Sequence, residues 1–222
     1  MIRIYLKKLA YLLVVTASFA VHATPADDFF RAVRSDNASG VKDLINRGFD
    51  PNIRDPKGQT GLLIALREPS PRVVQVLIDS PKTDVNGLNA SGESPLMMAA
   101  LKGQDDLVQR LIARDADINK TGWTPLHYAA TNGHVEIMKL LLDKSAFIDA
   151  QSPNGTTPLM MAAMYGSSAA VKLLLDEGAD PLMKNEQGMT AADFAQRASR
   201  PDAVQLLGAA MRAKVRPSDG KW

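Results

Sequence analysis

Side chains suited to acid–base or metal chemistry are few in this sequence. It has three histidines, His22, His127 and His134, and no cysteine. The absence of cysteine excludes disulfides, thiolate metal sites and a cysteine nucleophile. The sequence contains no Gly-x-Ser-x-Gly segment and no glycine-rich phosphate loop, and its carboxylates are scattered without an obvious pair. These residues predict no catalytic, metal or cofactor site.

His127 lies in the segment Gly122–Ala130 (GWTPLHYAA), which has weaker copies at Gly92–Ala100 (GESPLMMAA) and Gly155–Ala163 (GTTPLMMAA). Each copy predicts a helix start, because it has a glycine for a turn, a Thr or Ser that can cap the helix, and proline in the first helical position. The alanines that follow let another helix pack closely. No second histidine lines up with His127 to form a metal site. The equivalent positions hold Leu63, Met97, Met160 and Asp193.

This pattern resembles the ankyrin repeat. The segment Asn132–Leu142 follows in the family's order of short helix, glycine turn and second helix, and a loop follows at Ala146–Asp149. Similarity at a period of about 33 residues is diagnostic of that architecture. The resemblance implies an all-α fold, an ankyrin-repeat solenoid of paired antiparallel helices with β-turn or hairpin finger loops. It also implies that His127 hydrogen-bonds Thr124 and a neighbouring loop, and that His134 has a structural role.

The repeats predict one continuous array. Its expected parts are a signal peptide (1–23), an N-terminal capping repeat (24–54), four ankyrin repeats (55–86, 87–119, 120–150 and 151–184), a C-terminal capping repeat (185–215) and a polar tail (216–222).

Two units depart from the pattern. In the unit 55–86, Gly61 stands where the family has proline, and Pro69–Pro71 replaces the glycine turn between the helices. The spacing from Pro95 to Pro125 is 30 residues rather than 33, so we expect the finger at 119–122 to be short.

The helix ends differ in a similar way. Gly178 suits the left-handed backbone that ends a helix, whereas the matching positions hold Asp115 and Ser145, which tolerate that conformation less well.

The N-terminal segment reads as a secretory signal peptide. A basic start (Arg3, Lys7, Lys8) precedes an apolar run of about a dozen residues and the small-residue site Val21–Ala23. The run is short for a membrane span, although an uncleaved anchor is the alternative. We expect a mature chain that begins at Thr24 in the periplasm, with a secreted protein as second choice.

The charge of the mature chain does not favour nucleic acid as a partner. The whole chain has 26 basic and 24 acidic side chains, and the three basic residues of the leader leave 23 against 24. We also expect no membrane association after cleavage, and a monomer when the protein is alone.

The resemblance supplies a candidate binding surface, because family members grip partners with the finger tips and the exposed side of each first helix. Trp123 and Tyr165 are its aromatic anchors, a type enriched among interface hot spots. The alternative for Trp123 is that it only packs on the short finger. The predicted contacts are Lys57, Gln59, Ser91, Glu93, Leu101, Lys102, Thr121, Trp123, Thr131, Asn132, Asn154, Thr156, Met164 and Tyr165.

The methionines of the first helices allow two interpretations. They can fill the core or form a soft contact surface. Met97 and Met160 are predicted to lie in the core, and Met164 on the surface.

The resemblance therefore predicts a non-enzymatic, exported module that binds another protein through its concave face. One alternative is an inhibitor or immunity-type protein that occludes a periplasmic enzyme. The other, from a different class, is an enzyme that uses the solenoid as a support. Neither the residues nor the resemblance identifies the partner.

Overall fold

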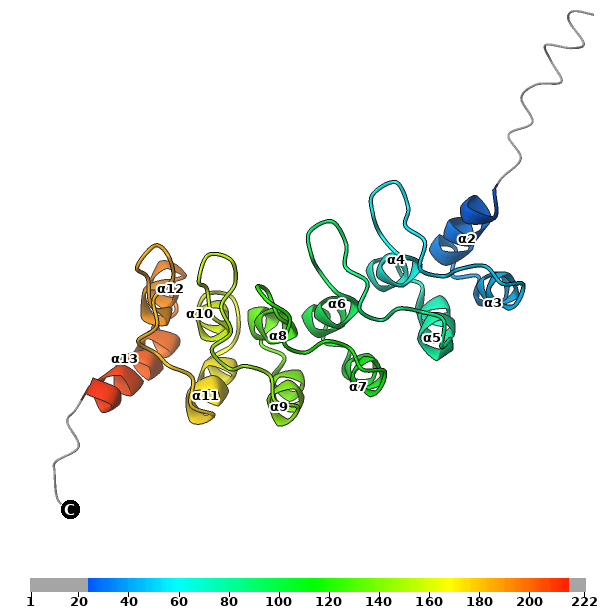
Figure 1. Cartoon of the computed structure of the whole chain (residues 1–222). Coiled ribbons are helices and arrows are strands. Elements are labelled where there is room, and N and C mark those ends of the chain that lie inside the picture. Colours follow the sequence, from blue (N-terminus) through cyan, green and yellow to red (C-terminus); the bar gives the residue numbers. More distant parts are fainter. Residues whose placement is uncertain (1–23, 216–222) are drawn as a thin grey trace, which may run out of the picture.

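The computed structural model describes residues 24–215, which form twelve α-helices and no strand. The helices follow one another in pairs along a single row, with the finger loops on one side (Figure 1). This confirms the all-α solenoid, although the fingers are turns with one isolated bridge, between Arg54 and Thr60. The signal peptide and tail predicted at 1–23 and 216–222 lie outside the described residues.

Each pair has a short first helix and a second helix that runs back beside it (Figure 1). The pairs are α2 (Pro25–Arg34) with α3 (Ala38–Asn46), α4 (Gly61–Arg67) with α5 (Pro71–Asp79), α6 (Pro95–Leu101) with α7 (Asp105–Ala113), α8 (Pro125–Asn132) with α9 (Val135–Asp143), α10 (Pro158–Met164) with α11 (Ser168–Asp176), and α12 (Ala191–Arg197) with α13 (Pro201–Val215).

Two of the three repeated segments begin their helices with the predicted side-chain cap. The hydroxyl of Ser94 accepts the amide N–H of Met97 at 3.2 Å, and the hydroxyl of Thr157 accepts that of Met160 at 3.3 Å. Such a cap satisfies one of the free N–H groups of the first turn. In the third segment, Thr124 makes no side-chain cap bond, and its hydroxyl lies 2.9 Å from Nδ1 of His127. Met97 and Met160 are 0% and 1% exposed, which confirms their place in the core.

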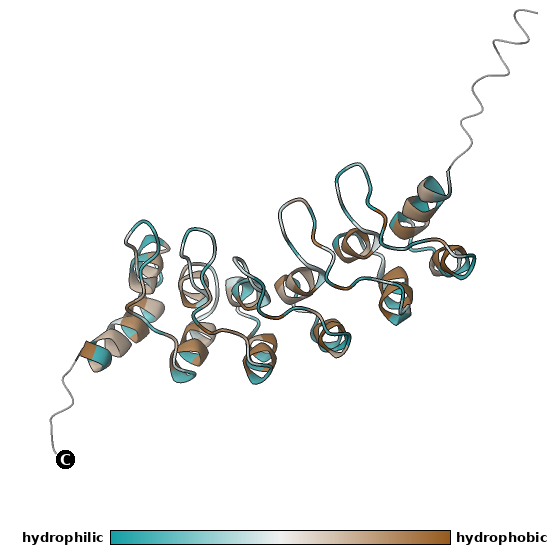
Figure 2. Cartoon of the chain, in the orientation of Figure 1, coloured by the Kyte–Doolittle hydropathy of each residue, from teal (hydrophilic) through white to brown (hydrophobic). Residues whose placement is uncertain are grey.

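Small residues let the first helices approach one another. The alanine pairs at 99–100, 129–130 and 162–163 are fully buried between neighbouring helices of the row. Figure 2 shows hydrophobic residues on the faces that helices turn toward each other, and hydrophilic residues along the fingers and the outer side of the second helices. Each unit therefore buries its apolar surface only by stacking on the next.

The unit without a glycine turn takes a helix cap from the preceding unit. Ser70, before α5, makes no side-chain cap bond. Asp36 instead accepts the N–H of Val73 at 2.8 Å and the Nε–H of Arg72 at 2.9 Å. Burial raises the pKa of Asp36, but these hydrogen bonds outweigh it and hold the pKa below the ordinary 3.8. Asp36 makes these bonds from a left-handed backbone, with φ of 50°.

The second helices end in the left-handed backbone that the sequence indicated. Gly178 has φ of 94°, and the matching residues Asp115 and Ser145 also have positive values, 58° and 65°. A residue with a Cβ is uncommon in this region, although Asp and Asn enter it more often than most.

Asparagines in the loops link successive units. Asn119 accepts the N–H of Phe147 at 2.8 Å and donates Nδ2–H to the carbonyl of Ser145 at 2.7 Å. Asn52 and Asn86 make the same two bonds to the loops that follow them. Each of these side chains satisfies a donor and an acceptor of the neighbouring loop.

Asp149 takes the next place in this series. It accepts the N–H of Asp180 at 3.1 Å, but an ionised carboxylate cannot donate to the carbonyl of Gly178 as an asparagine would. Burial raises the pKa of Asp149 above its ordinary 3.8, and the bond from Asp180 offsets only part of that effect. The last link of the series is therefore incomplete.

The finger between α7 and α8 is visibly the shortest of the row, as predicted (Figure 1). In the preceding finger, the side-chain oxygen of Asn89 accepts the N–H groups of Ser91 and Glu93, both at 2.9 Å. Asp55 and Asn185 form the same turn in their own fingers. The finger between α7 and α8 is three residues shorter and lacks this turn.

Within residues 24–215, no helix combines the length and the apolar character needed to cross a membrane.

Candidate functional site

His127 ties the start of α8 to the next finger. Its Nδ1 lies 2.9 Å from Thr124 Oγ1, and its Nε2 lies 2.9 Å from the carbonyl oxygen of Thr156. A carbonyl can only accept, so Nε2 carries the proton and Nδ1 accepts from Thr124. The side chain is fully buried. These contacts confirm the hydrogen bonds that the resemblance implied.

The environment of His127 does not suit it for acid–base chemistry at neutral pH. Burial lowers its pKa to about 4, although hydrogen bonds to the carbonyls of Thr156 and Ala150 oppose the shift. His134 is also structural, because its Nε2 lies 3.0 Å from the carbonyl oxygen of Leu101. Among the described residues, no three His, Cys, Asp or Glu side chains are grouped as metal ligands.

Trp123, on the short finger, is half-buried. Its ring packs edge-on against His127, with centroids 5.2 Å apart, and against Tyr128, with centroids 6.5 Å apart. Trp123 therefore packs on α8 of its own unit, and not only on the short finger. Part of the ring is still exposed, so its contact with a partner stays a prediction.

Glu93, on the preceding finger, contacts one of these aromatic residues, Tyr128. Its Oε1 accepts the hydroxyl of Tyr128 at 3.0 Å, and its Oε2 accepts Nδ2–H of Asn89 at 2.7 Å. Burial raises the pKa of Tyr128 above its ordinary value, and the charge of Glu93 raises it further, so the phenol stays a donor. The structure thus holds the carboxylate of Glu93 in a fixed position between two units.

Several of the predicted contact residues form hydrogen bonds within the chain. Lys102 donates from Nζ to the carbonyls of Leu66 and Arg67, at the end of α4. Asn132 donates to the carbonyl of Leu101 at 2.7 Å. These side chains join neighbouring first helices, so their substitution would affect stability as well as any binding.

The predicted contacts differ in exposure. The exposed members are Lys57, Ser91, Lys102, Thr121, Asn132, Asn154 and Tyr165. The half-buried members are Gln59, Glu93, Leu101, Trp123, Thr131 and Met164.

Two of the expectations about exposure were wrong. Thr156 is only 2% exposed, because its finger lies against the neighbouring unit and its N–H binds Ser152 Oγ at 3.0 Å. Its side chain is not available to a partner. Met164, expected on the surface, is half-buried and packs against the core. Tyr165, the next residue, is 58% exposed.

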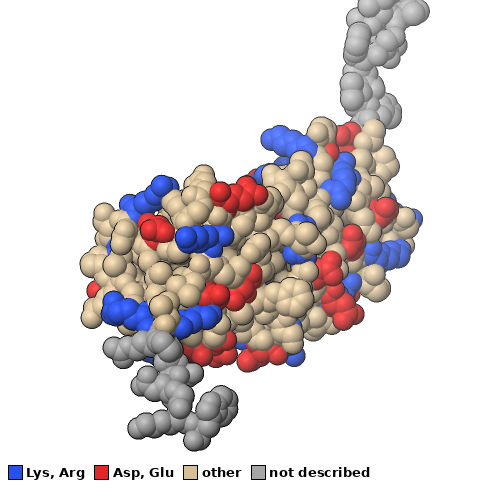
Figure 3. Space-filling view, turned by 60° about the vertical axis from the view of Figure 1, so that its left-hand side comes forward, with Lys and Arg blue, Asp and Glu red and all other residues tan. Residues whose placement is uncertain are grey.

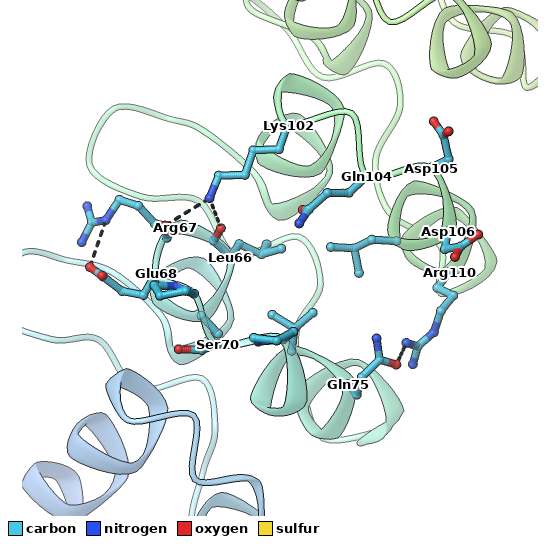
Figure 4. Close-up of a pocket in the computed structure, with 15 residues that line it drawn as sticks. Leu66, Arg67, Glu68, Ser70, Gln75, Lys102, Gln104, Asp105, Asp106 and Arg110 are labelled. Carbon is cyan, nitrogen blue, oxygen red and sulfur yellow. Dashed lines mark hydrogen bonds and ion pairs between the residues drawn. The ribbon is translucent and has the colours of Figure 1, made fainter.

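A cavity of about 610 Å³ lies away from the fingers, where the α4–α5 turn faces the α6–α7 turn (Figure 4). Val74 and Leu107 contribute apolar side chains to its lining. The cations at its rim are already engaged: Lys102 binds the end of α4, and Arg110 binds Gln75 and Asp79. These basic side chains therefore serve the junction between two units, whereas the hydroxyl of Ser70, also in the lining, is buried without a hydrogen-bond partner.

The surface charge is mixed. Figure 3 shows Lys and Arg interspersed with Asp and Glu over the face in view, without one large region of a single sign. This pattern gives no support to binding of a polyanion.

Two residues beside the predicted binding surface are not among the predicted contacts. Tyr128 belongs to the repeat motif, and its hydroxyl fixes Glu93, 35 residues away. Arg67, at the end of α4, donates from its guanidinium to Gln59 Oε1 at 2.7 Å. Both lie on first helices, next to predicted contacts, so a helical projection of each unit would have identified them.

The paired helices, the capped starts and the row of fingers define a helical repeat protein. The family model described as "Ankyrin repeats (3 copies)" matches residues 29–121, 70–152, 99–185 and 148–219. The chain therefore belongs to the ankyrin repeat family. Ankyrin repeats are protein–protein interaction modules, and the family is generally a non-enzymatic scaffold.

A solved structure supports the same assignment. The crystal structure of an ankyrin repeat domain from Acinetobacter baumannii AYE superposes with a TM-score of 0.71 and 26% sequence identity, and the match covers 82% of this chain and 97% of that one.

Curated relatives match over a shorter region. Human Neurogenic locus notch homolog protein 4 is 36% identical over 86 residues, and the Drosophila melanogaster Neurogenic locus Notch protein is 35% identical over 87 residues. Each match covers 39% of this chain but only 4% and 3% of those proteins, so the chain resembles a small part of them.

Proposed function

We propose that this protein binds one partner protein through the surface formed by its fingers and the exposed side of its first helices. The observation that carries the proposal is the presence of exposed and half-buried predicted contacts on successive units whose spacing is fixed by hydrogen bonds. Glu93, for example, is held by groups from two units. A rigid surface loses little freedom on binding, which favours affinity.

We further propose that the protein acts in the periplasm after removal of residues 1–23. The basic start, the apolar run and the small-residue site Val21–Ala23 in the sequence support this proposal. A new N-terminus at Thr24 is compatible with the fold, because the backbone N of Thr24 donates to Asp27 Oδ2 at 2.9 Å, at the start of α2. If cleavage made this nitrogen an ammonium group, the carboxylate of Asp27 would compensate its charge beside the positive end of the helix.

A pull-down from periplasmic extract, with the chain as bait, tests the binding proposal. Tyr165→Ala and Phe147→Ala form a matched pair, because both aromatics are exposed, at 58% and 65%, and only Tyr165 belongs to the predicted surface. We expect Tyr165→Ala to weaken binding of the captured partner by about thirtyfold, as for a hot-spot aromatic. Phe147→Ala should bind like the unmodified chain.

Two results would count against this proposal: failure to capture a stoichiometric partner, or equal loss of affinity in both variants. An inhibitory role is the narrower form of the proposal. It requires that the captured partner be an enzyme and that its activity fall when the chain is added. Recovery of a membrane-bound chain that retains Met1 would refute the proposed processing.

A further inference from the structure

One position on the fingers differs in its charge pairing from one unit to the next. Gln59 lies immediately before the cap of α4, and its Oε1 accepts the guanidinium of Arg67, eight residues later, at 2.7 Å. Glu93 is the equivalent residue before α6, and Leu101, again eight residues later, is the equivalent of Arg67. The unit of α6 therefore has the stronger acceptor, the carboxylate of Glu93, but lacks a cation equivalent to Arg67.

The carboxylate of Glu93 is bound only by neutral groups in the described structure. Its two partners are the hydroxyl of Tyr128 and the amide of Asn89. The nearby ammonium of Lys120 donates to the carbonyl of Thr121 at 3.1 Å and forms no ion pair with Glu93. A half-buried carboxylate that forms no ion pair attracts a cation, because partial burial weakens the screening of its charge.

The surroundings of Glu93 also suit the stem of a long cationic side chain. Tyr128 and Trp123 are half-buried aromatics, and the half-buried Leu101, at the end of α6, holds the position from which Arg67 reaches Gln59 in the preceding unit. Arginine stacks on aromatic rings and buries its methylene groups against apolar surface while its guanidinium pairs with a carboxylate. Trp123, on the short finger, is partly exposed, and its ring packs against that of Tyr128, with centroids 6.5 Å apart.

We infer that Glu93, Tyr128, Trp123 and Leu101 form a recognition site for an arginine side chain of the partner protein. This inference rests on the proposed function and adds the chemistry of one contact. The partner's guanidinium takes the place at Glu93 that Arg67 takes at Gln59. Its methylene stem lies against Leu101 and the two aromatic rings.

Titration with N-acetyl-arginine amide tests the site without knowledge of the partner. The neutral isostere N-acetyl-citrulline amide is the matched ligand. In a chain with Trp222→Phe, Trp123 supplies the single indole N–H signal in an NMR spectrum. We expect a saturable shift of that signal with the arginine amide, and affinity for the citrulline amide that is lower by about fivefold or more.

Three variants make the test specific. Glu93→Gln should reduce arginine binding to the level of citrulline, and Leu101→Arg should block it, because the new guanidinium would occupy the site as Arg67 does at Gln59. Glu136→Gln is the control, since Glu136 is an exposed glutamate on α9 whose side chain is 74% exposed. It should leave the titration unchanged.

Equal affinity for the two amides, or undiminished arginine binding by Glu93→Gln, would overturn the inference. The outcome is separable from that of the proposed function. A captured partner that binds Glu93→Gln as tightly as the unmodified chain, but binds Tyr165→Ala weakly, would refute the arginine site and leave the binding surface in place. If no partner is captured, the proposed function fails, and the amide titration still decides whether Glu93 selects a guanidinium.

Discussion

Asp149→Asn should stabilise the protein at neutral pH. An asparagine could keep the bond from the N–H of Asp180 and add the Nδ2–H bond to Gly178, as Asn119 does with Ser145 at 2.7 Å. One such bond contributes about 1 kcal/mol net. The substitution also removes a half-buried charge whose pKa is raised by burial. For a chain of this size, about 1 kcal/mol corresponds to a rise in Tm of about 2–4 °C.

The gain should depend on pH. Because the pKa of Asp149 is higher in the folded chain than the ordinary 3.8, protonation favours folding, and that contribution is lost as the pH rises through the raised pKa. A protonated carboxyl can also donate to Gly178. We therefore expect the advantage of Asp149→Asn to be largest at pH 7, to shrink as the pH falls through the raised pKa, and to reach its minimum below pH 3.8.

Chemical denaturation of both proteins across this range measures the difference. Asn119→Asp is the reverse control, since it replaces a complete link with an incomplete one and should lower the free energy of unfolding by a similar amount. No gain from Asp149→Asn at pH 7, or no loss from Asn119→Asp, would refute the argument that these links contribute to stability. A gain that does not depend on pH would refute its electrostatic part.

Three further predictions concern the contacts between units. Burial lowers the pKa of His127 from 6.5 to about 4 in the folded chain, so the neutral form favours folding. Roughly 3 kcal/mol of stability should therefore be lost as the pH falls from 6.5 to 4. Chemical denaturation should show this pH dependence in the unmodified protein and not in His127→Leu. A double-mutant cycle of Thr124→Ala with His127→Ala should show coupling of at least about 0.5 kcal/mol, whereas additive effects would contradict the 2.9 Å bond. Asp36→Gly should lower the unfolding midpoint although glycine relieves the left-handed strain, because α5 loses the cap at Val73; an unchanged or higher midpoint would show that the cap has no net value.

The predictions from sequence succeeded where the signal lies within one unit. The capped start of α6, the core position of Met97 and the positive φ of Asp115 each depend on residues within a few positions of one another. Such local patterns determine helix starts and ends before any packing is known. The contacts of His127 were anticipated because the family resemblance carries them.

Contacts between units were harder to anticipate. Thr156 was expected to be exposed, and its burial depends on how closely two fingers lie together. The cap that Asp36 provides to α5 joins residues 37 positions apart, and the bond from Tyr128 to Glu93 joins residues 35 apart. The repeat period indicates that such pairs belong to neighbouring units. It does not give the relative position of two side chains, because insertions and deletions in the fingers shift them.

The short finger shows how a change within one unit alters the surface of its neighbour. The short finger lacks a turn like the one that Asn89 forms in the preceding finger, and Trp123 packs against His127 and Tyr128. Tyr128 in turn donates to Glu93 on the preceding unit. The hydrogen bonds and neighbours of Glu93 therefore depend on residues of two units and on the length of the short finger. If this coupling is correct, restoring three residues to the short finger should change arginine binding at Glu93 while leaving the sequence around Glu93 unchanged.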